Sequence, residues 1–397
     1  MLRKAAMLVA VSAAVAAHAE DAPGLEQMWK LIQQQQQEID RLKAELGQTQ
    51  TQVEATDAKV DATADAMEQQ RVGGADSSLA SWTEKTSLGG YGEIHYNHVE
   101  DGDDKIDAHR FVLYVGHQFT DKVRFFSEIE LEHAFSGDGA PGEVELEQAY
   151  IEWDFAERHS LQIGQFLLPI GVINETHEPE TFYGTERNKV EAEVIPATWW
   201  EAGVMLTGEI LPGLSYNAAV HSGLNVDDTR IRSGRQKNAE ATAEDLAFTG
   251  RLKYTGIAGL EVAASVQHQQ DIAQGGFSES AEATLIESHI IYQVADFQVR
   301  ALWAEWNIDG AEFEIAGADK LEGWYVEPSY KLSEQLGVFV RYSEWDRGDK
   351  MTTDYEAYDF GINYWLAPQV VLKADYTDTV GDGDEGDAFN LGVGWSF

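Results

Sequence analysis

The chain has no cysteine, which excludes disulfides, thiolate catalysis and cysteine-ligated zinc. It has only 28 basic residues against 69 acidic ones, a formal net charge of −41. Nucleic-acid binding depends on Lys and Arg side chains that neutralise phosphates, so this balance argues against it. Prolines are also few, 8 in 397 residues, whereas glycines number 36 and aromatic residues are frequent. Abundant glycine and aromatic residues are typical of many strands joined by tight turns.

The amino terminus predicts export. Arg3 and Lys4 precede the apolar run AAMLVAVSAAVAA, and Ala17 at its end and Ala19 supply small residues. A basic start, a short apolar stretch and small residues before a cleavage site indicate a signal peptide over residues 1–19. After this segment no run approaches the roughly 18 apolar residues of a membrane-spanning helix. We therefore expect an exported bacterial protein whose chain does not span a membrane with helices.

A seven-residue period follows the signal peptide. Its first core position is apolar at every repeat: Leu25, Ile32, Ile39, Leu46, Val53, Val60 and Met67. A strict heptad of this length predicts a left-handed, α-helical coiled coil of several chains. We therefore expect residues 20–72 to form a coiled coil on the periplasmic side, followed by a linker over residues 73–87. The alternative is a solvated, partly disordered segment, because QQQQQ and TQTQVEAT are of low complexity.

From residue 88 to residue 397 the period is two, which predicts an all-β domain. Sixteen strands are expected, over residues 88–99, 107–119, 123–133, 143–155, 160–171, 198–210, 214–225, 245–257, 260–273, 281–294, 297–309, 320–333, 336–347, 354–367, 370–380 and 387–397. Most are longer than the about five to six residues of ordinary strands. Short turns alternate with longer, mostly acidic loops at residues 100–106, 134–142, 172–197, 226–244, 274–280, 310–319, 348–353 and 381–386. These features indicate an antiparallel transmembrane β-barrel of the outer-membrane type.

Each expected strand has one apolar face and one polar face. In residues 297–303, for example, Phe297, Val299 and Trp303 alternate with Arg300. Charged side chains remain ionised inside a barrel only if the inside is wet, so the apolar face is expected to contact lipid. The basic side chains expected in the lumen are Arg110, Arg124, Arg251, Arg300, Lys331, Arg341 and Lys373. They are interpreted either as ordinary charge balance in a wet wall or as a ladder for anions.

Aromatic residues near the strand ends are interpreted as girdles at the two membrane interfaces. The expected members are Phe119, Phe155, Trp199, Trp200, Tyr254, Phe297, Trp345, Trp365 and Trp395. The final stretch FNLGVGWSF presents an aromatic stripe that ends at Phe397, and it is expected to pair with the first strand and close the barrel.

The third long loop, residues 172–197, is the longest strand connection and the expected constriction of the lumen. Loops of this length are uncommon unless they are functional. Its chemistry-bearing residues are Glu175, His177, Glu178, Glu180, Glu186, Arg187, Lys189, Glu191 and Glu193. A ring of carboxylates would bias the lumen towards cations. The alternative is that the loop folds over the outside and the glutamates are merely solvated.

No cofactor, catalytic site or metal site is predicted. The sequence HEPE at 177–180 lacks the second His of a zinc-protease helix, and no G-x-S-x-G motif occurs. The acidic stretches at 100–107 and 381–387 have carboxylates suited to Ca²⁺ or Mg²⁺, but solvated loop tips are the simpler interpretation.

Several stretches resemble the phosphate-selective porin O and P family of Gram-negative outer-membrane porins. They are LGGYGEIHYN at 88–97, RFVLYVGHQFTDKVRFFSEIELEH at 110–133, EVELEQAYIEWDF at 143–155, LQIGQFLLPIGVINETHEP at 161–179 and the terminal GVGWSF. The resemblance implies a sixteen-stranded homotrimer, a third loop folded inward and passive diffusion. It also implies that Phe397 is the recognition signal for the barrel-assembly machinery. The third loop departs from the family, because it has only Arg187 and Lys189 among six glutamates.

From the residues and the resemblance together, the expected function is a trimeric outer-membrane porin embedded in lipid and lipopolysaccharide. It is expected to pass small hydrophilic solutes and ions with weak selectivity or a preference for cations. One alternative is a porin selective for anions or phosphate. Another, of a different class, is a structural tether in which the coiled coil reaches peptidoglycan and the barrel is its anchor.

Overall fold

The computed structural model describes residues 82–100, 102–137, 139–346, 355–381 and 386–397. The predicted signal peptide, the predicted coiled coil with its core from Leu25 to Met67, and most of the predicted linker lie outside these residues. Within the described part of the chain, no helix is long and apolar enough to cross a membrane.

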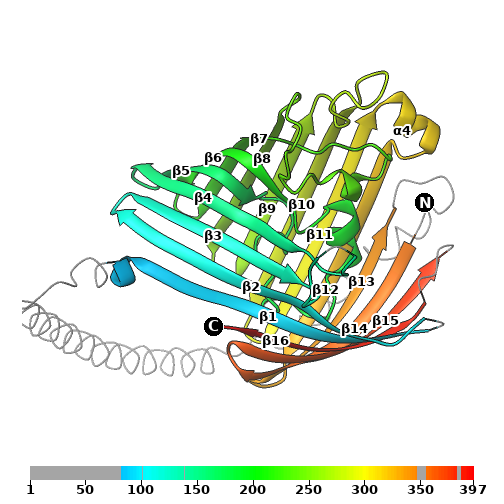
Figure 1. Ribbon diagram of the computed structural model, residues 1–397. Coiled ribbons are helices and arrows are strands. Elements are labelled where there is room, and N and C mark those ends of the chain that lie inside the picture. The colour runs from blue at the N-terminus through cyan, green and yellow to red at the C-terminus, as the bar shows by residue number, and fades with distance from the viewer. Residues whose placement is uncertain (1–81, 101, 138, 347–354, 382–385) are drawn as a thin grey trace, which may run out of the picture. The chain divides into compact units, whose positions relative to one another are not determined.

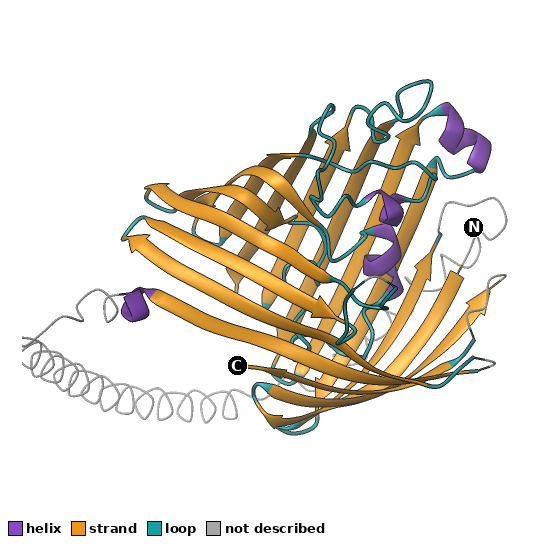
Figure 2. Cartoon of the chain, viewed as in Figure 1, coloured by secondary structure: helices purple, strands orange, loops and turns teal. Residues whose placement is uncertain are grey.

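The described residues form a closed barrel of sixteen antiparallel strands (Figures 1 and 2). The strands are β1 (Thr86–Val99), β2 (Lys105–Thr120), β3 (Val123–Glu132), β4 (Val144–Ala156), β5 (His159–Leu167), β6 (Trp200–Leu211), β7 (Leu214–His221), β8 (Ala247–Ile257), β9 (Leu260–Gln269), β10 (Glu282–Val294), β11 (Phe297–Asp309), β12 (Lys320–Lys331), β13 (Leu336–Trp345), β14 (Tyr355–Ala367), β15 (Val370–Gly381) and β16 (Ala388–Ser396). Three short helical segments lie in the loops: η1 (Val190–Val194), η2 (Ile231–Gly234) and α4 (Ala311–Ala316). All sixteen predicted strands are present, and β11 has the predicted bounds.

Three strands end four residues earlier than predicted, β5 at Leu167, β7 at His221 and β9 at Gln269. The apolar residues beyond these ends do not continue the sheet. They are buried in one cluster with other loop and wall residues: Leu168, Ile170, Leu224 and Ile272. Pro169 also has no N–H group for the sheet. The third long connection therefore runs from 168 to 199, longer than the predicted 172–197.

The two faces of the wall have opposite chemistry. On β10, Ile286 and Ile290 are 44% and 40% exposed, whereas Glu287 and His289 are 0% and 4% exposed. A water-soluble protein normally buries the apolar residues and exposes the charged ones. Large exposed apolar side chains recur on almost every strand. This is the arrangement of a barrel whose outer surface lies in lipid.

The interior is not uniformly polar. The helical turn η1 lies inside the barrel (Figure 2) and packs against inward-facing side chains of β11 to β13. The contact includes a hydrogen bond of 2.8 Å from the Trp306 indole N–H to the Val194 carbonyl oxygen. One part of the inner wall is therefore an apolar core that fixes the third loop. The alternating pattern of the strands predicted only polar residues on the inner face and did not predict this core.

The aromatic girdle was predicted correctly only in part. Phe119 and Phe155 are exposed on the outer surface, but Trp199, Trp200 and Trp345 are 0%, 4% and 2% exposed. Trp199 packs on Trp306, with 6.1 Å between the ring centroids. Their interpretation as girdle residues was wrong, because Trp199 belongs to the third loop itself and packing inside the barrel buries all three side chains.

The barrel closes where the final residue meets β1. The N–H group of Phe397 donates to the Gly90 carbonyl oxygen at 2.9 Å, and the N–H group of Gly90 donates to the Phe397 carbonyl oxygen at 3.0 Å. A side chain at Gly90 would collide with the Val112 carbonyl oxygen and the Phe397 ring. Glycine at this position therefore permits the close approach of β2 and the terminal aromatic residue.

The lipid-facing assignment gives a direct test. Replacing Ile290 by Arg places a charge on the outer surface of β10, so we expect a loss of about 2–4 kcal/mol in the free energy of unfolding. Reversible denaturant unfolding in lipid vesicles measures this loss. Ile290→Val is the matched control and is expected to cost about 1 kcal/mol or less. An equally small cost for the Arg variant would contradict the assignment.

Candidate functional site

The third loop, residues 168–199, is held together by a buried carboxylate. Glu191 accepts hydrogen bonds from the N–H groups of Val172 and Ile173, at 2.8 and 2.7 Å, and from the Tyr325 hydroxyl at 2.8 Å. Its side chain is 0% exposed. Because one carboxylate joins the start of the loop, η1 and strand β12, Glu191 is a structural residue and not an open part of a charged rim.

A second polar residue fixes the base of the loop. The Asn174 side-chain amide donates to the carbonyl oxygens of Leu168 and Trp199, at 2.8 and 2.9 Å. Its side-chain oxygen accepts the N–H group of Trp199 at 2.7 Å. Asn174 thus joins the two ends of the loop through all three bonds. Satisfied buried networks of this kind specify one conformation of the backbone.

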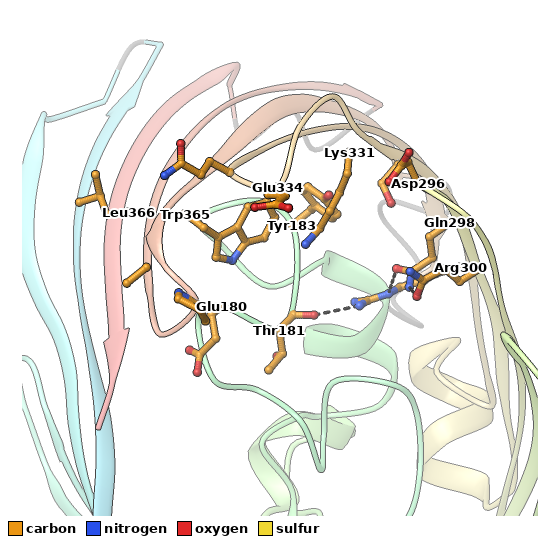
Figure 3. A pocket seen from close by; sticks show the side chains of 15 residues that line it. Glu180, Thr181, Tyr183, Asp296, Gln298, Arg300, Lys331, Glu334, Trp365 and Leu366 are labelled. Atoms are coloured by element: carbon orange, nitrogen blue, oxygen red, sulfur yellow. Dashed lines mark hydrogen bonds between the residues drawn. The ribbon is translucent and has the colours of Figure 1, made fainter. Parts of the chain in front are cut away.

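The far part of the loop is held by polar side chains of the barrel wall. Four consecutive loop carbonyl oxygens each accept one hydrogen bond: Thr181 from Arg300 at 2.8 Å, Phe182 from Asn363 at 3.1 Å, Tyr183 from Arg341 at 3.3 Å and Gly184 from Lys373 at 2.8 Å. Figure 3 shows the bond from Arg300 to Thr181. Three of the basic residues predicted in the lumen therefore bind the loop backbone, which a free ladder for anions would not do.

The other predicted basic residues have different partners. Arg251 forms an ion pair with Glu175 of the loop. Arg110 pairs with Glu93 at 2.7 Å. Arg124 pairs with Glu152 and Asp154 beside the turn at 121–122. The Lys331 ammonium lies 4.6 Å from the centroid of the Trp365 ring.

Most loop glutamates are also engaged. Beyond Glu175 and Glu191, Glu178 accepts from the Tyr114 hydroxyl at 3.3 Å, and Glu180 accepts from the Ser396 hydroxyl. Glu186 contacts His95 at 3.0 Å and accepts from the Asn97 amide at 2.9 Å. Burial opposes ionisation of this carboxyl, but the hydrogen bond and charge of His95 outweigh it and lower the pKa of Glu186 to about 2.

His177 lies buried between two carboxylates of the wall. Its Nε2 atom is 3.5 Å from Glu128 Oε1 and 3.5 Å from Glu147 Oε2. Burial opposes the charged imidazolium, but attraction by the two carboxylates outweighs it and raises the pKa of His177 to about 10. The imidazole therefore joins the loop to strands β3 and β4.

Two cavities meet this loop. The turn-side cavity, about 580 Å³, is lined by Thr181, Tyr183 and residues near the short turns, including Lys331 and Trp365 (Figure 3). The loop-side cavity, about 660 Å³, is lined by Phe182 and by residues 185–189. The segment 180–189 therefore contributes residues to both cavities.

The loop-side cavity contains three guanidinium groups whose hydrogen bonds all end on neutral oxygens. Arg187 donates to the Thr198 hydroxyl at 2.6 Å. Arg232 donates to the Ala192 and Ala197 carbonyl oxygens at 2.5 and 2.9 Å, and Arg235 donates to the Thr198 carbonyl oxygen at 2.6 Å. We call these three residues the arginine cluster.

Burial lowers the pKa of all three members of the arginine cluster. The charge of Arg110 adds to the effect on Arg187, and the charge of Arg232 helps to lower the pKa of Arg235 to about 10. By contrast, three carboxylates of the same cavity have basic partners: Glu93 with Arg110, Glu145 with Lys237 and Asp359 with Arg341. The three guanidinium groups thus bring N–H donors and positive charge into a cavity whose lining also contains Glu132, Glu147 and Asp375.

Sequence reasoning missed Arg232 and Arg235. They belong to RIRSGRQK at 230–237, a basic run in a strongly acidic chain, which was the available signal. The remaining predicted loop residues have less defined roles. Lys189 lines the loop-side cavity, and Glu193 is a half-buried residue of η1.

Comparisons with known proteins agree with this geometry. The sequence profile of the family described as Gram-negative porin matches residues 201–384. An uncharacterized protein of Aquifex aeolicus (strain VF5) is 31% identical, with 82% of this chain and 83% of that protein covered.

Solved structures show the same fold. The outer membrane channel DcaP of Acinetobacter baumannii gives a TM-score of 0.57 at 14% identity, with 79% of this chain and 97% of that chain covered. The anion-selective porin from Comamonas acidovorans gives 0.56 at 11% identity, with 79% and 99% covered. At these identities the likeness shows the fold alone.

The role of Glu191 can be tested by hydrogen exchange. Glu191→Ala leaves two buried N–H groups and a tyrosine hydroxyl without their acceptor. We expect the amides of Val172 and Ile173 to exchange at least about tenfold faster, measured by mass spectrometry on peptides from the start of the loop. Glu180→Gln, in the middle part of the loop, is the control and should leave these amides protected. Unchanged exchange in the Ala variant would show that the loop does not depend on this carboxylate.

Proposed function

This chain belongs to the Gram-negative porins, and we propose that its third loop narrows a passive diffusion pore for small hydrophilic solutes and ions in the outer membrane. The family and the fold support an outer-membrane channel. The narrowing is supported by the inward contacts of the loop. Its backbone is bonded to wall residues on β11, β13, β14 and β15, and His177 contacts β3 and β4.

We further propose that this pore prefers small anions. The preference for cations expected from the sequence rested on the loop glutamates. Glu175 is paired with Arg251, and Glu178, Glu180 and Glu191 accept hydrogen bonds that hold the loop, so these four carboxylates do not form an open charged rim. The observation that carries the proposal is the arginine cluster, since its hydrogen bonds end only on neutral oxygens. Basic groups along a pore select anions by their charge.

The resemblance to phosphate-selective porins fits such a preference, but it does not decide between phosphate and other small anions. The loop itself supplies only one guanidinium, from Arg187, and the fourth long loop supplies Arg232 and Arg235. A phosphate or carboxylate group is suited to bidentate bonding by arginine. Chloride is therefore the simplest probe, and phosphate and small carboxylates are the comparisons.

Reversal potentials in planar bilayers test the proposed preference. With a KCl gradient we expect the wild type to be anion-selective, and the triple variant R187Q/R232Q/R235Q to lose most of this selectivity, by several-fold in the chloride-to-potassium permeability ratio. Arg230→Gln is the matched control, because Arg230 lies on the same loop, is 77% exposed at its side chain and pairs with Asp228. A cation-selective wild type would restore the interpretation based on the glutamates.

We also propose that the protein is a homotrimer and that the predicted coiled coil sets its register. The heptad period supports association of several chains, and the porin fold is consistent with association of several barrels. Deleting residues 20–72 should abolish the trimer while single barrels still conduct, as measured by native mass spectrometry and bilayer recording. An unchanged trimer would show that the coiled coil does not set the register of the trimer. A full-length protein that never conducts would favour the structural tether.

A further inference from the structure

Three side chains from distant parts of the sequence meet where the third loop crosses the wall. Glu128 lies on β3, Glu147 on β4 and His177 on the loop, and they are 1%, 1% and 2% exposed. The imidazole Nε2 is 3.5 Å from one oxygen of each carboxylate. One ligand atom from each residue lies within 4.8 Å of the other two. The geometry thus brings one nitrogen and two oxygens around a common point.

A β-bulge builds this corner. Glu128 pairs with Gln148, whereas the next residue, Ile129, pairs with Leu146, so Glu147 is the extra residue of β4. Strict alternation would place Glu147 and Gln148 on opposite faces of the sheet. Instead Glu147 is buried, and the Gln148 amide donates to Glu128 Oε2 at 2.6 Å. Bulges commonly redirect side chains in this way beside functional sites.

The atoms that face one another have no hydrogen-bond partner among the described residues. They are Glu128 Oε1, Glu147 Oε2 and His177 Nε2. The second polar atom of two of these side chains does have a partner. Gln148 donates to the other oxygen of Glu128, and His177 Nδ1 lies 3.1 Å from the Asn174 carbonyl oxygen. Since a carbonyl oxygen only accepts, Nδ1 carries the proton. Orientation of a histidine by a backbone carbonyl is the usual outer shell of a metal ligand.

The distances favour a metal ion over a direct hydrogen bond. An N–H···O bond usually spans about 2.7–3.2 Å between heavy atoms. Ligand atoms at about 2.0–2.1 Å from a tetrahedral Zn²⁺ lie about 3.4 Å from each other. The two observed separations of 3.5 Å match the second value.

We propose that Glu128, Glu147 and His177 bind one divalent transition-metal ion, for which Zn²⁺ is the best fit, and that this ion fastens the third loop to β3 and β4. An imidazole nitrogen favours zinc-like ions over Ca²⁺ and Mg²⁺, which prefer all-oxygen sites. Two carboxylates neutralise the charge of the ion. A proton competes with the metal ion for Nε2 of His177, because the protonated histidine forms an ion pair with the two carboxylates. The proposal does not depend on which ions the pore prefers.

Metal binding to the purified full-length protein tests the site. After treatment with EDTA and dialysis, the protein in detergent is titrated with Zn²⁺, and the bound metal is measured by elemental mass spectrometry. Co²⁺ serves as a second probe, since tetrahedral coordination gives intense visible absorption. We expect one ion per chain, lost at least about tenfold in affinity in Glu147→Gln and His177→Gln. The control is His133→Gln, which removes a histidine from the separate group Asp107, His109 and His133.

A second readout separates binding from misfolding. Zn²⁺ should slow amide exchange in the loop peptide around His177 in the wild type and in His133→Gln, and it should have no effect in Glu147→Gln. Each variant is run on a gel without heating, to check that it migrates as a folded barrel. Binding of equal strength in the Glu147 and His177 variants, loss of binding in the His133 variant, or no retained ion in the wild type would each overturn the proposal.

Discussion

The structure depends on one constraint: in lipid, every backbone N–H and C=O group must find its partner within the protein. Sixteen strands meet this requirement by pairing in a closed ring in which β1 bonds to β16. Closure then fixes the two faces of each strand. Apolar side chains such as Ile286 face outward, and charged ones such as Glu287 face inward. Most of the charge that the strands carry thereby faces the lumen, where it must be wet or paired, whereas Glu305 shares the outer face with Ile286 and is paired with Lys320.

The lumenal charges are used mainly to hold a loop. The wall residues Arg300, Arg341 and Lys373 bind successive carbonyl oxygens of the third loop, and Glu191 gathers the loop's own N–H groups. A loop with many unpaired backbone groups would be costly to bury, and these side chains remove that cost. The dry contact of η1 with β11 to β13 adds apolar stabilisation. The arginine cluster also contacts the loop, through hydrogen bonds that end on neutral oxygens.

Much of this fold was predictable because strand periodicity is local. A two-residue period over 11 to 14 residues gave all sixteen strands, and the alternation of turn lengths gave their order in the barrel. Local patterns were misleading where tertiary contacts take over. Trp199 and Trp345 have the sequence position of girdle residues, yet both are buried in the cluster inside the barrel. Three strands stop early for the same reason, since their last apolar residues pack against the loop inside the barrel.

The sequence by itself determined the class of the protein and the two faces of each strand, because each follows from the alternation of neighbouring residues. Its basic and acidic residues also marked the lumen and the third loop as chemically important. Only the tertiary structure decided which of these charges are free. Lys373 and the Gly184 carbonyl oxygen are 189 positions apart in the chain, and no local pattern relates them. The meeting of Glu128, Glu147 and His177 likewise requires a bulge, a strand pair and a folded loop, which act together only in the closed barrel.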